Sequence, residues 1–192
     1  MDFAVTAAIL VALTIPAGVW SEGEMESSVL YEFSQPTDSH QCRTINDTVM
    51  GGGSSSSFET PGNGIAVFSG NVSVENYGGF ASVRSAPKFR DLSRWQGLAL
   101  RVRGDGQSYR LGLKTDATWD GVMYQASFQT SADEWTEVRL PFGTCCTPKF
   151  RGRDVPDAPA LDPSRIRQIS LMISEKQEGP FRLEIDWIAA YR

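Results

Sequence analysis

The sequence has little of the chemistry that most catalytic and metal sites require. Its 192 residues include a single histidine, His40, and three cysteines. A catalytic triad with a histidine base and a metal site with several histidines are therefore not expected. Asp116 and Asp120 stand in an acidic loop, but their spacing does not match an EF-hand. We predict a chain that is not an enzyme and that holds no metal and no cofactor.

The chain also lacks a basic cluster. Its formal net charge is −5, and its lysines and arginines are spread along the sequence. An acidic surface repels phosphate backbones, so nucleic acid is not an expected partner. Dispersed basic residues also argue against a patch for anionic membranes. The length fits one domain, or one domain with a leader.

A long apolar run occurs only at the N-terminus. Residues 3–20 are almost entirely apolar, and the sequence then turns polar and acidic. This pattern predicts a signal peptide or an N-terminal anchor over residues 1–21, although Asp2 and the lack of Lys or Arg depart from a usual signal. We expect an exported or membrane-associated protein, periplasmic or secreted, that meets a membrane only through an uncleaved leader. The alternatives are a buried helix, a misassigned start codon, or a location in mitochondria or another organelle.

From residue 29 onward the sequence has the pattern of a β protein. Short segments alternate apolar and polar residues, with turn residues between them and few helical windows. The Gly-Asp-Gly turn at residues 104–106 predicts a hairpin of residues 98–103 with 109–114. Residues 168–174 and 181–188 are expected to form the last pair of strands. Asp162 is expected to cap one helical turn that has Pro163 at its first position.

Many short strands with few helices predict an all-β fold, a jelly-roll β-sandwich over residues 29–192. Trp95, Trp135 and Trp187 are expected to supply bulk to its core, because large aromatic side chains are mostly buried. The alternative is that a row of these rings forms a platform for sugar stacking.

One loop departs from the strand pattern. Residues 46–58, NDTVMGGGSSSSF, contain an Asn-Asp pair, three glycines and four serines. Asn and Asp hydrogen-bond their own backbone in turns, and glycine lets another chain approach closely. We expect an ordered loop that leads into a strand, with its Asn-Asp pair held by backbone amides and by Arg151 or Arg153. The alternative is a flexible Ser/Gly linker.

The turns and strand ends form a series that resembles a known family. The segments are NDTVMGG, GNVSVENYGGFASVRS, LRVRGDGQSYRL, SADEWTEVRLPF, PKFRGR and EKQEGPFRLEIDWIAAY. In this order, over residues 45–191, they resemble the complex I intermediate-associated protein 30 family. The resemblance implies a galactose-binding-like β-sandwich and a chaperone-like role in assembly of respiratory complex I, without a catalytic centre. Cys42 stands where members commonly have Trp, and residues 143–147 also depart from the family pattern.

The resemblance also suggests a set of site residues and a disulfide. In an exported chain Cys42 is expected to pair with Cys145 or Cys146, since both places replace family positions. Polar residues in the family-like segments are candidates for a binding surface or for staples between loops. They are Asn46, Asp47, Asn76, Arg84, Arg101, Tyr109, Gln125, Arg151, Arg153, Lys176 and Gln177.

Three functions remain open from the sequence. The leading hypothesis is a domain for binding or assembly that contacts a protein partner, with respiratory-complex subunits implied by the resemblance alone. The second is an exported carbohydrate-binding module. The third is an enzyme acting on extracellular glycans or esters, which would need paired carboxylates in a pocket. The fold does not decide among them, because β-sandwiches host all three.

Overall fold

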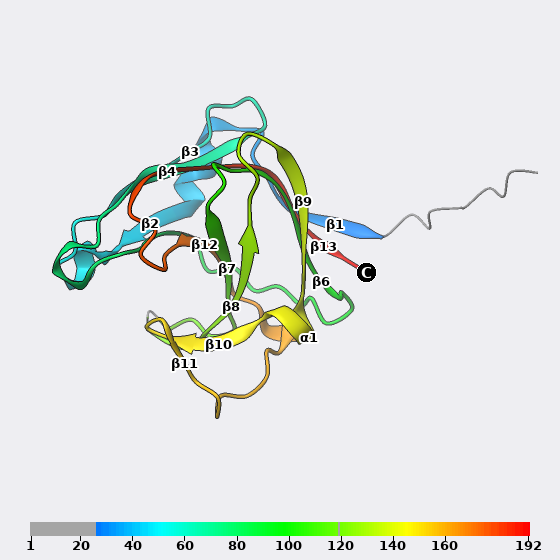
Figure 1. Ribbon diagram of the computed structural model, residues 1–192. Helices are drawn as coiled ribbons and strands as arrows, with labels where there is room; N and C mark the ends of the chain where they lie inside the picture. The colour runs from blue at the N-terminus through cyan, green and yellow to red at the C-terminus, as the bar shows by residue number, and fades with distance from the viewer. Residues whose placement is uncertain (1–25, 119) are drawn as a thin grey trace, which may run out of the picture.

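The computed structural model describes residues 26–118 and 120–192 and shows two packed antiparallel sheets (Figure 1). The predicted leader, residues 1–21, lies outside the described residues. No helix in the described part of the chain is both long enough and apolar enough to cross a membrane.

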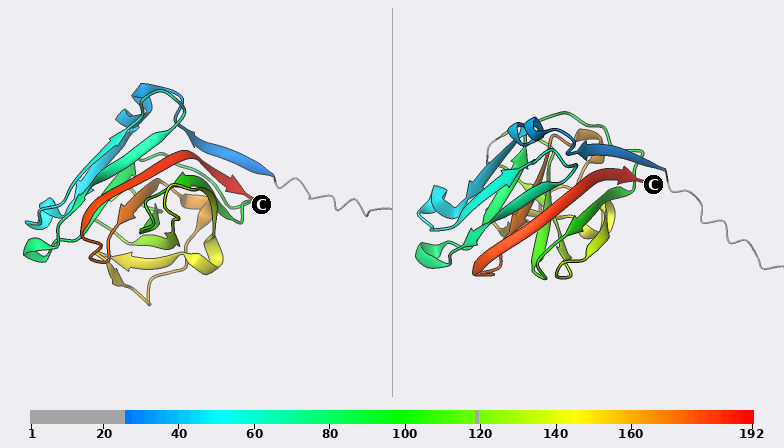
Figure 2. Two further views of the ribbon diagram at one scale, coloured as in Figure 1. Left: turned by 45° about the horizontal axis from the view of Figure 1, so that its top comes forward. Right: turned by 90° about the horizontal axis from the view of Figure 1, so that it is seen from above.

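The first sheet has six strands. In order across the sheet they are β3 (Ser55–Glu59), β4 (Ala66–Val72), β13 (Gly179–Tyr191), β6 (Gly97–Arg103) and β9 (Trp135–Pro141), with β1 (Ser27–Glu32) beside the end of β13. β13 is the central strand: its first half pairs with β4 and its second half with β1. Both further views show β1 alongside the last residues of β13 (Figure 2).

The second sheet has seven strands and carries most of the polar residues discussed below. In order they are β11 (Arg153–Asp154), β10 (Thr147–Phe150), β8 (Met123–Gln129), β7 (Ser108–Lys114), β12 (Gln168–Ile173), β5 (Ala81–Ser85) and β2 (Cys42–Asn46). Short helical turns connect strands: η1 (Pro36–Gln41), η2 (Asp47–Met50), η3 (Glu75–Tyr77), α1 (Phe142–Cys145) and η4 (Pro163–Arg165). The predicted jelly-roll sandwich is confirmed. The helical turn with its cap is confirmed as well, since Asp162 accepts a hydrogen bond from the Ser164 N–H in η4.

The strand positions follow the sequence pattern, but two predicted pairings are wrong. β6 pairs with β13 and β9 in the first sheet, whereas β7 pairs with β8 and β12 in the second. The turn at residues 104–106 therefore crosses between sheets and closes no hairpin. β12 and β13 likewise lie in different sheets. At the turn of residues 104–106 the backbone of Gly104 lies close against the Thr130 side chain. A Cβ on Gly104 would lie 2.3 Å from the Thr130 hydroxyl oxygen, so no larger residue fits there without a shift.

The core lies between the two sheets and comes from the inward half of each strand. Leu98, Leu100 and Val102 of β6 face Leu111 and Leu113 of β7 across it, all almost fully buried. Their burial is the main favourable contribution to folding, about 1.5–3 kcal/mol for each such side chain.

The prediction for the three tryptophans holds only for Trp95, which is in the core cluster. Trp135 and Trp187 are half-buried. The Trp135 ring lies under the guanidinium groups of Arg101 and Arg103, on strands that pair in the first sheet.

Candidate functional site

The Asn-Asp loop is ordered around one buried carboxylate. Asp47 begins η2, immediately after β2, and its exposed fraction is 0%. Its carboxylate accepts hydrogen bonds from the Ser54 N–H (2.9 Å), the Ser54 hydroxyl, the Gly79 N–H (2.7 Å) and the Phe80 N–H (3.2 Å). The loops of residues 47–53 and 74–80 consequently lie side by side at one end of the sandwich (Figure 2). The expectation that backbone amides hold this residue is confirmed.

These hydrogen bonds also determine the charge of Asp47. Burial by itself would raise the pKa of this carboxyl, but the donors from Ser54, Gly79 and Phe80 outweigh burial and hold the pKa below its usual value. Glycine is required around the carboxylate for steric reasons. A Cβ on Gly52 would lie 2.4 Å from the Asp47 carboxylate carbon and one of its oxygens. A Cβ on Gly78 would lie 2.6 Å from the other oxygen. The loop is therefore a packed structure that leaves an ionised carboxylate inside it.

The same end of the molecule carries exposed apolar side chains and strained backbone. Val49 and Met50, at the tip of η2, are 66% and 62% exposed. Asn76, Glu175 and Lys176 have positive φ angles of 52°, 65° and 58°, which are uncommon for residues other than glycine. Such strain occurs preferentially at binding and switch regions, so this end is a candidate for contact with a partner.

A polar row crosses the outer face of the seven-stranded sheet. Strand register places one residue from each of six neighbouring strands directly opposite the next, in the order Arg43, Arg84, Ser170, Gly112, Gln125 and Thr147. Arg110 lies one pair along from Gly112, opposite Ser127. We call this set, with Lys114 and Lys149 on the same face, the polar face.

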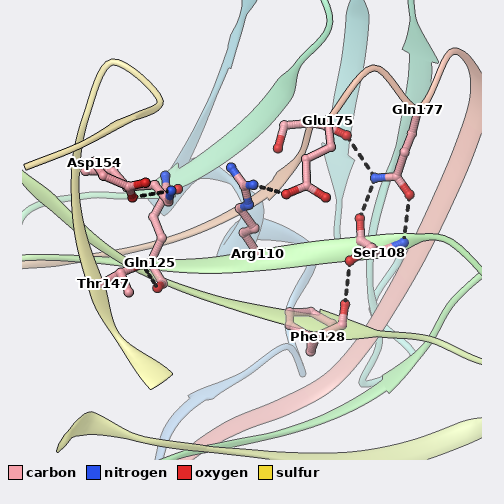
Figure 3. Close-up of polar contacts among 10 residues, drawn as sticks. Ser108, Arg110, Gln125, Phe128, Thr147, Asp154, Glu175 and Gln177 are labelled. Carbon is pink, nitrogen blue, oxygen red and sulfur yellow. Dashed lines mark hydrogen bonds and ion pairs between the residues drawn. The ribbon is translucent and has the colours of Figure 1, made fainter. Parts of the chain in front are cut away.

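Gln125 and Arg110 of the polar face carry buried polar atoms that have no hydrogen-bond partner among the described residues. The Gln125 side chain belongs to a residue that is only 6% exposed, and its Oε1 has no partner among the described residues. Its amide nitrogen lies 3.7 Å from the Met123 sulfur. Arg110 forms an ion pair with Glu175, yet its buried Nε also lacks a hydrogen-bond partner in the described part of the chain (Figure 3). Buried polar atoms are rarely left in this state, so these two atoms mark an unusual place in the sheet.

Loops held by ion pairs surround the polar face. Lys114 is almost fully buried, and its ammonium donates to the Thr118 carbonyl (2.6 Å) and lies 3.3 Å from Asp116. Arg151 forms an ion pair with Asp120, which ties the segment at Asp120 to the hairpin of β10 and β11. The prediction that Arg151 or Arg153 reaches the Asn-Asp loop is wrong, because Arg151 is held by Asp120, and Arg153 lies exposed on β11 at the far edge of the sheet from β2.

The other predicted residues have mainly structural contacts. The Gln177 side chain accepts from the Ser108 N–H (2.9 Å) and donates to the Ser108 carbonyl (2.8 Å), so it staples its loop to β7 (Figure 3). Asn46 accepts from the Ser56 hydroxyl at 2.7 Å, which links the two sheets.

Tyr109 is buried in the core, and Arg101 faces away from the polar face. The Tyr109 hydroxyl donates to Asp105, and its pKa is raised by burial and by that carboxylate. Arg101 lies on the first sheet in an ion pair with Asp186. The structure thus places Arg84 and Gln125 on one sheet face, three strands apart, and gathers Asn46, Asp47, Asn76, Lys176 and Gln177 towards the loop end.

Sequence reasoning missed Arg43, Arg110 and Lys114. The alternation of residues 108–114, in which Arg110 and Lys114 fall between buried Tyr109, Leu111 and Leu113, could have placed the last two on one outward face.

The predicted disulfide is not formed, since Cys42 has a free thiol. Cys42 is on β2, at one edge of the seven-stranded sheet, and residues 145–146 immediately precede β10, near the other edge. Five strand spacings of about 4.8 Å separate these strands, whereas a disulfide needs Cα atoms about 5.5 Å apart. Cys42 packs against the core near a cavity of about 30 Å³, and burial raises the pKa of its thiol to about 11.

The fold is an antiparallel jelly-roll β-sandwich that also occurs in solved structures of other proteins. A family 11 carbohydrate-binding module from Clostridium thermocellum, solved in complex with a mixed-linked tetrasaccharide, matches with a TM-score of 0.63. The match covers 85% of this chain and 94% of that one at 17% identity, a level that shows a shared fold alone.

The sequence comparisons give the family. The model of the family described as complex I intermediate-associated protein 30 (CIA30) matches residues 31–185, and the chain belongs to this family. The Drosophila melanogaster protein named complex I intermediate-associated protein 30, mitochondrial, is 25% identical over 189 residues, covering 85% of this chain and 62% of the relative. The Mus musculus protein of the same name is 35% identical over 106 residues, covering 53% and 32%. The chain thus spans less than two thirds of these relatives.

Proposed function

We propose that this chain is a non-catalytic binding domain that assists the assembly of respiratory complex I through contacts with protein subunits. The observation that carries the proposal is the family match over residues 31–185, nearly all of the described sandwich. The two relatives described above carry the word mitochondrial in their names, so we propose an organelle as the location instead of export.

The arrangement of carboxylates supports a non-catalytic role. Asp120 is paired with Arg151, Asp186 with Arg101, and Glu184 with Arg103 and Arg182. The pKa of Glu184 is lowered because hydrogen bonds from the two arginines outweigh its partial burial. A carboxyl group that acts as a general acid needs a raised pKa, so these paired groups are suited to holding loops and strands in place.

The test is a purification of tagged, full-length chain expressed in Drosophila cells from which the endogenous relative has been depleted. We expect the chain to migrate with incomplete complex I on native gels and mass spectrometry to identify complex I subunits in that band. Restored complex I abundance would support the assembly role further. The proposal fails if the chain is expressed and folded but neither migrates with complex I subunits nor restores their assembly.

Carbohydrate binding is the second candidate. The specific observation in its favour is the pair of unpartnered polar atoms, Gln125 Oε1 and Arg110 Nε, on one sheet face. Against it, the outward positions of β2, β5, β12, β7, β8 and β10 carry no aromatic side chain on which a sugar ring could stack. A glycan array would show selective binding by the chain if this candidate were correct, and an array without binding would count against it.

A further inference from the structure

We infer that the polar face is a docking surface for an extended acidic segment of a protein partner, with Arg110 and Gln125 at its centre. This inference rests on the proposed function, because it names the surface through which the domain contacts a protein. The first argument is charge. The outward positions of the six strands from β2 to β10 carry five basic residues and no acidic residue, although the chain has a net charge of −5. The five are Arg43, Arg84, Arg110, Lys114 and Lys149.

The second argument is the position of two arginines of the polar face. Arg43 and Arg84 are directly opposite each other on neighbouring strands, so two guanidinium groups lie side by side on this face. Burial lowers the pKa of Arg84, which shows that its guanidinium is partly removed from water. A carboxylate laid across these strands would fit both side chains, since Arg presents a planar fork that matches carboxylate geometry.

The third argument is the pair of unpartnered atoms. Gln125 is more than nine-tenths buried and directs an amide oxygen that no described residue satisfies, and Arg110 Nε lies on the adjacent strand. If the Gln125 amide is flipped, so that its oxygen and nitrogen exchange places, its NH2 group is the one without a hydrogen-bond partner among the described residues. An extended peptide offers both complements, a carboxylate for Arg110 and a backbone N–H or C=O for Gln125. Three strand spacings of about 4.8 Å separate Arg84 from Gln125, which is the span of about four extended residues.

The fourth argument concerns Glu175. This residue already forms an ion pair with Arg110 from a loop in which its own φ is 65° and its side chain is 54% exposed. Glu175 occupies the position that we assign to a carboxylate of the partner (Figure 3). A partner would therefore displace Glu175 from Arg110 as it binds.

The experiment measures fluorescence anisotropy of a labelled hexa-glutamate peptide with the full-length chain at low and physiological salt. We expect Arg110→Gln to weaken binding at least fivefold and Gln125→Leu at least threefold. Glu175→Gln should strengthen binding at least twofold, because it frees Arg110. Ser127→Glu is a fold-preserving alternative to Arg110→Gln, since it adds a carboxylate at an exposed position directly opposite Arg110. It should also weaken binding at least fivefold.

The matched controls are on the other sheet. Arg101 and Asp186 form an ion pair there, as Arg110 and Glu175 do on the polar face. Arg101→Gln therefore changes the net charge as Arg110→Gln does, and Asp186→Asn changes it as Glu175→Gln does. Both should leave binding within twofold of the unmodified chain. The inference is overturned if the Arg101 and Arg110 variants lose binding equally, or if hexa-glutamine binds as well as hexa-glutamate. Polygalacturonate that displaces the peptide and binds more tightly would instead define an anionic glycan surface.

The two proposals fail in different ways. If complex I subunits are captured but the acidic peptide does not bind, the assembly role stands and the docking surface is wrong. If the peptide binds through Arg110 and Gln125 but no complex I subunit is captured, the surface stands and the assembly role is wrong.

Discussion

Replacement of Asp47 by alanine tests the most specific structural inference, that one buried carboxylate holds the loop end together. Asp47→Ala leaves the Gly79 and Phe80 N–H groups and the Ser54 N–H without an acceptor in a buried place. It also removes the acceptor of the Ser54 hydroxyl. The effect should exceed that of losing an ordinary surface carboxylate, because every donor lost is a buried or partly buried group.

The magnitude follows from the number of donors. A hydrogen bond to a charged group contributes about 1.5–3 kcal/mol, and a buried donor left unsatisfied costs about 1–3 kcal/mol. The four contacts are not additive, since the Ser54 hydroxyl also lies 3.3 Å from the Ser73 carbonyl and can turn to it. Water can enter the space left by the carboxylate as well. We therefore expect Asp47→Ala to lower the free energy of unfolding by about 3–5 kcal/mol, a large part of the 5–15 kcal/mol of a typical domain.

The assay is urea unfolding at pH 7, followed by tryptophan fluorescence and by circular dichroism. Asp154→Ala is the control, because Asp154 is an exposed carboxylate in a surface ion pair with Lys149 and should change stability by less than about 1 kcal/mol. An Asp47→Ala protein within 1 kcal/mol of the unmodified chain would refute the reasoning. If that protein kept its stability but lost partner binding, the loop would be a contact site and not a structural staple.

The remaining predictions concern glycine, pH and the thiol. Gly78→Ala should destabilise by about 1–3 kcal/mol, because its Cβ would lie 2.6 Å from an Asp47 oxygen, whereas Gly143→Ala, with open space around it, should stay within 0.5 kcal/mol in the same urea titration. The folded pKa of Asp47 is depressed, so its stabilisation is present above the unfolded pKa of about 3.9 and is lost as pH falls through the folded value. The difference in unfolding free energy between the unmodified chain and Asp47→Asn should therefore narrow below about pH 4, and a constant gap down to pH 2 would contradict this. At pH 8 the Cys42 thiol, with a pKa of about 11, should react with iodoacetamide far more slowly in the native chain than in urea, as read by mass spectrometry of its peptide; equal rates would show that it is not buried.

The fold class was accessible from sequence because strand formation follows a local pattern. Leu98, Leu100 and Val102 alternate with outward arginines, and this period of two is enough to predict β6. The partners of β6 were not accessible. A Gly-Asp-Gly turn at residues 104–106 is compatible with a hairpin and with a crossing between sheets. The choice depends on which distant strands, here β9 and β13, offer complementary surfaces to bury.

The candidate site, like the fold, was predictable from the sequence only in part. The sequence alone favoured an ordered loop around the Asn-Asp pair, because Asn and Asp hydrogen-bond their own backbone in turns and glycine allows close approach. It did not determine that Gly79 and Phe80 supply the donors. Nor did it place Arg84, Arg110 and Gln125 on one face, or separate Cys42 from residues 145–146 by the width of a sheet. Those relations exist only once strands 35 to 92 residues apart pair in register, and register is decided by burial of the whole core rather than by any local segment.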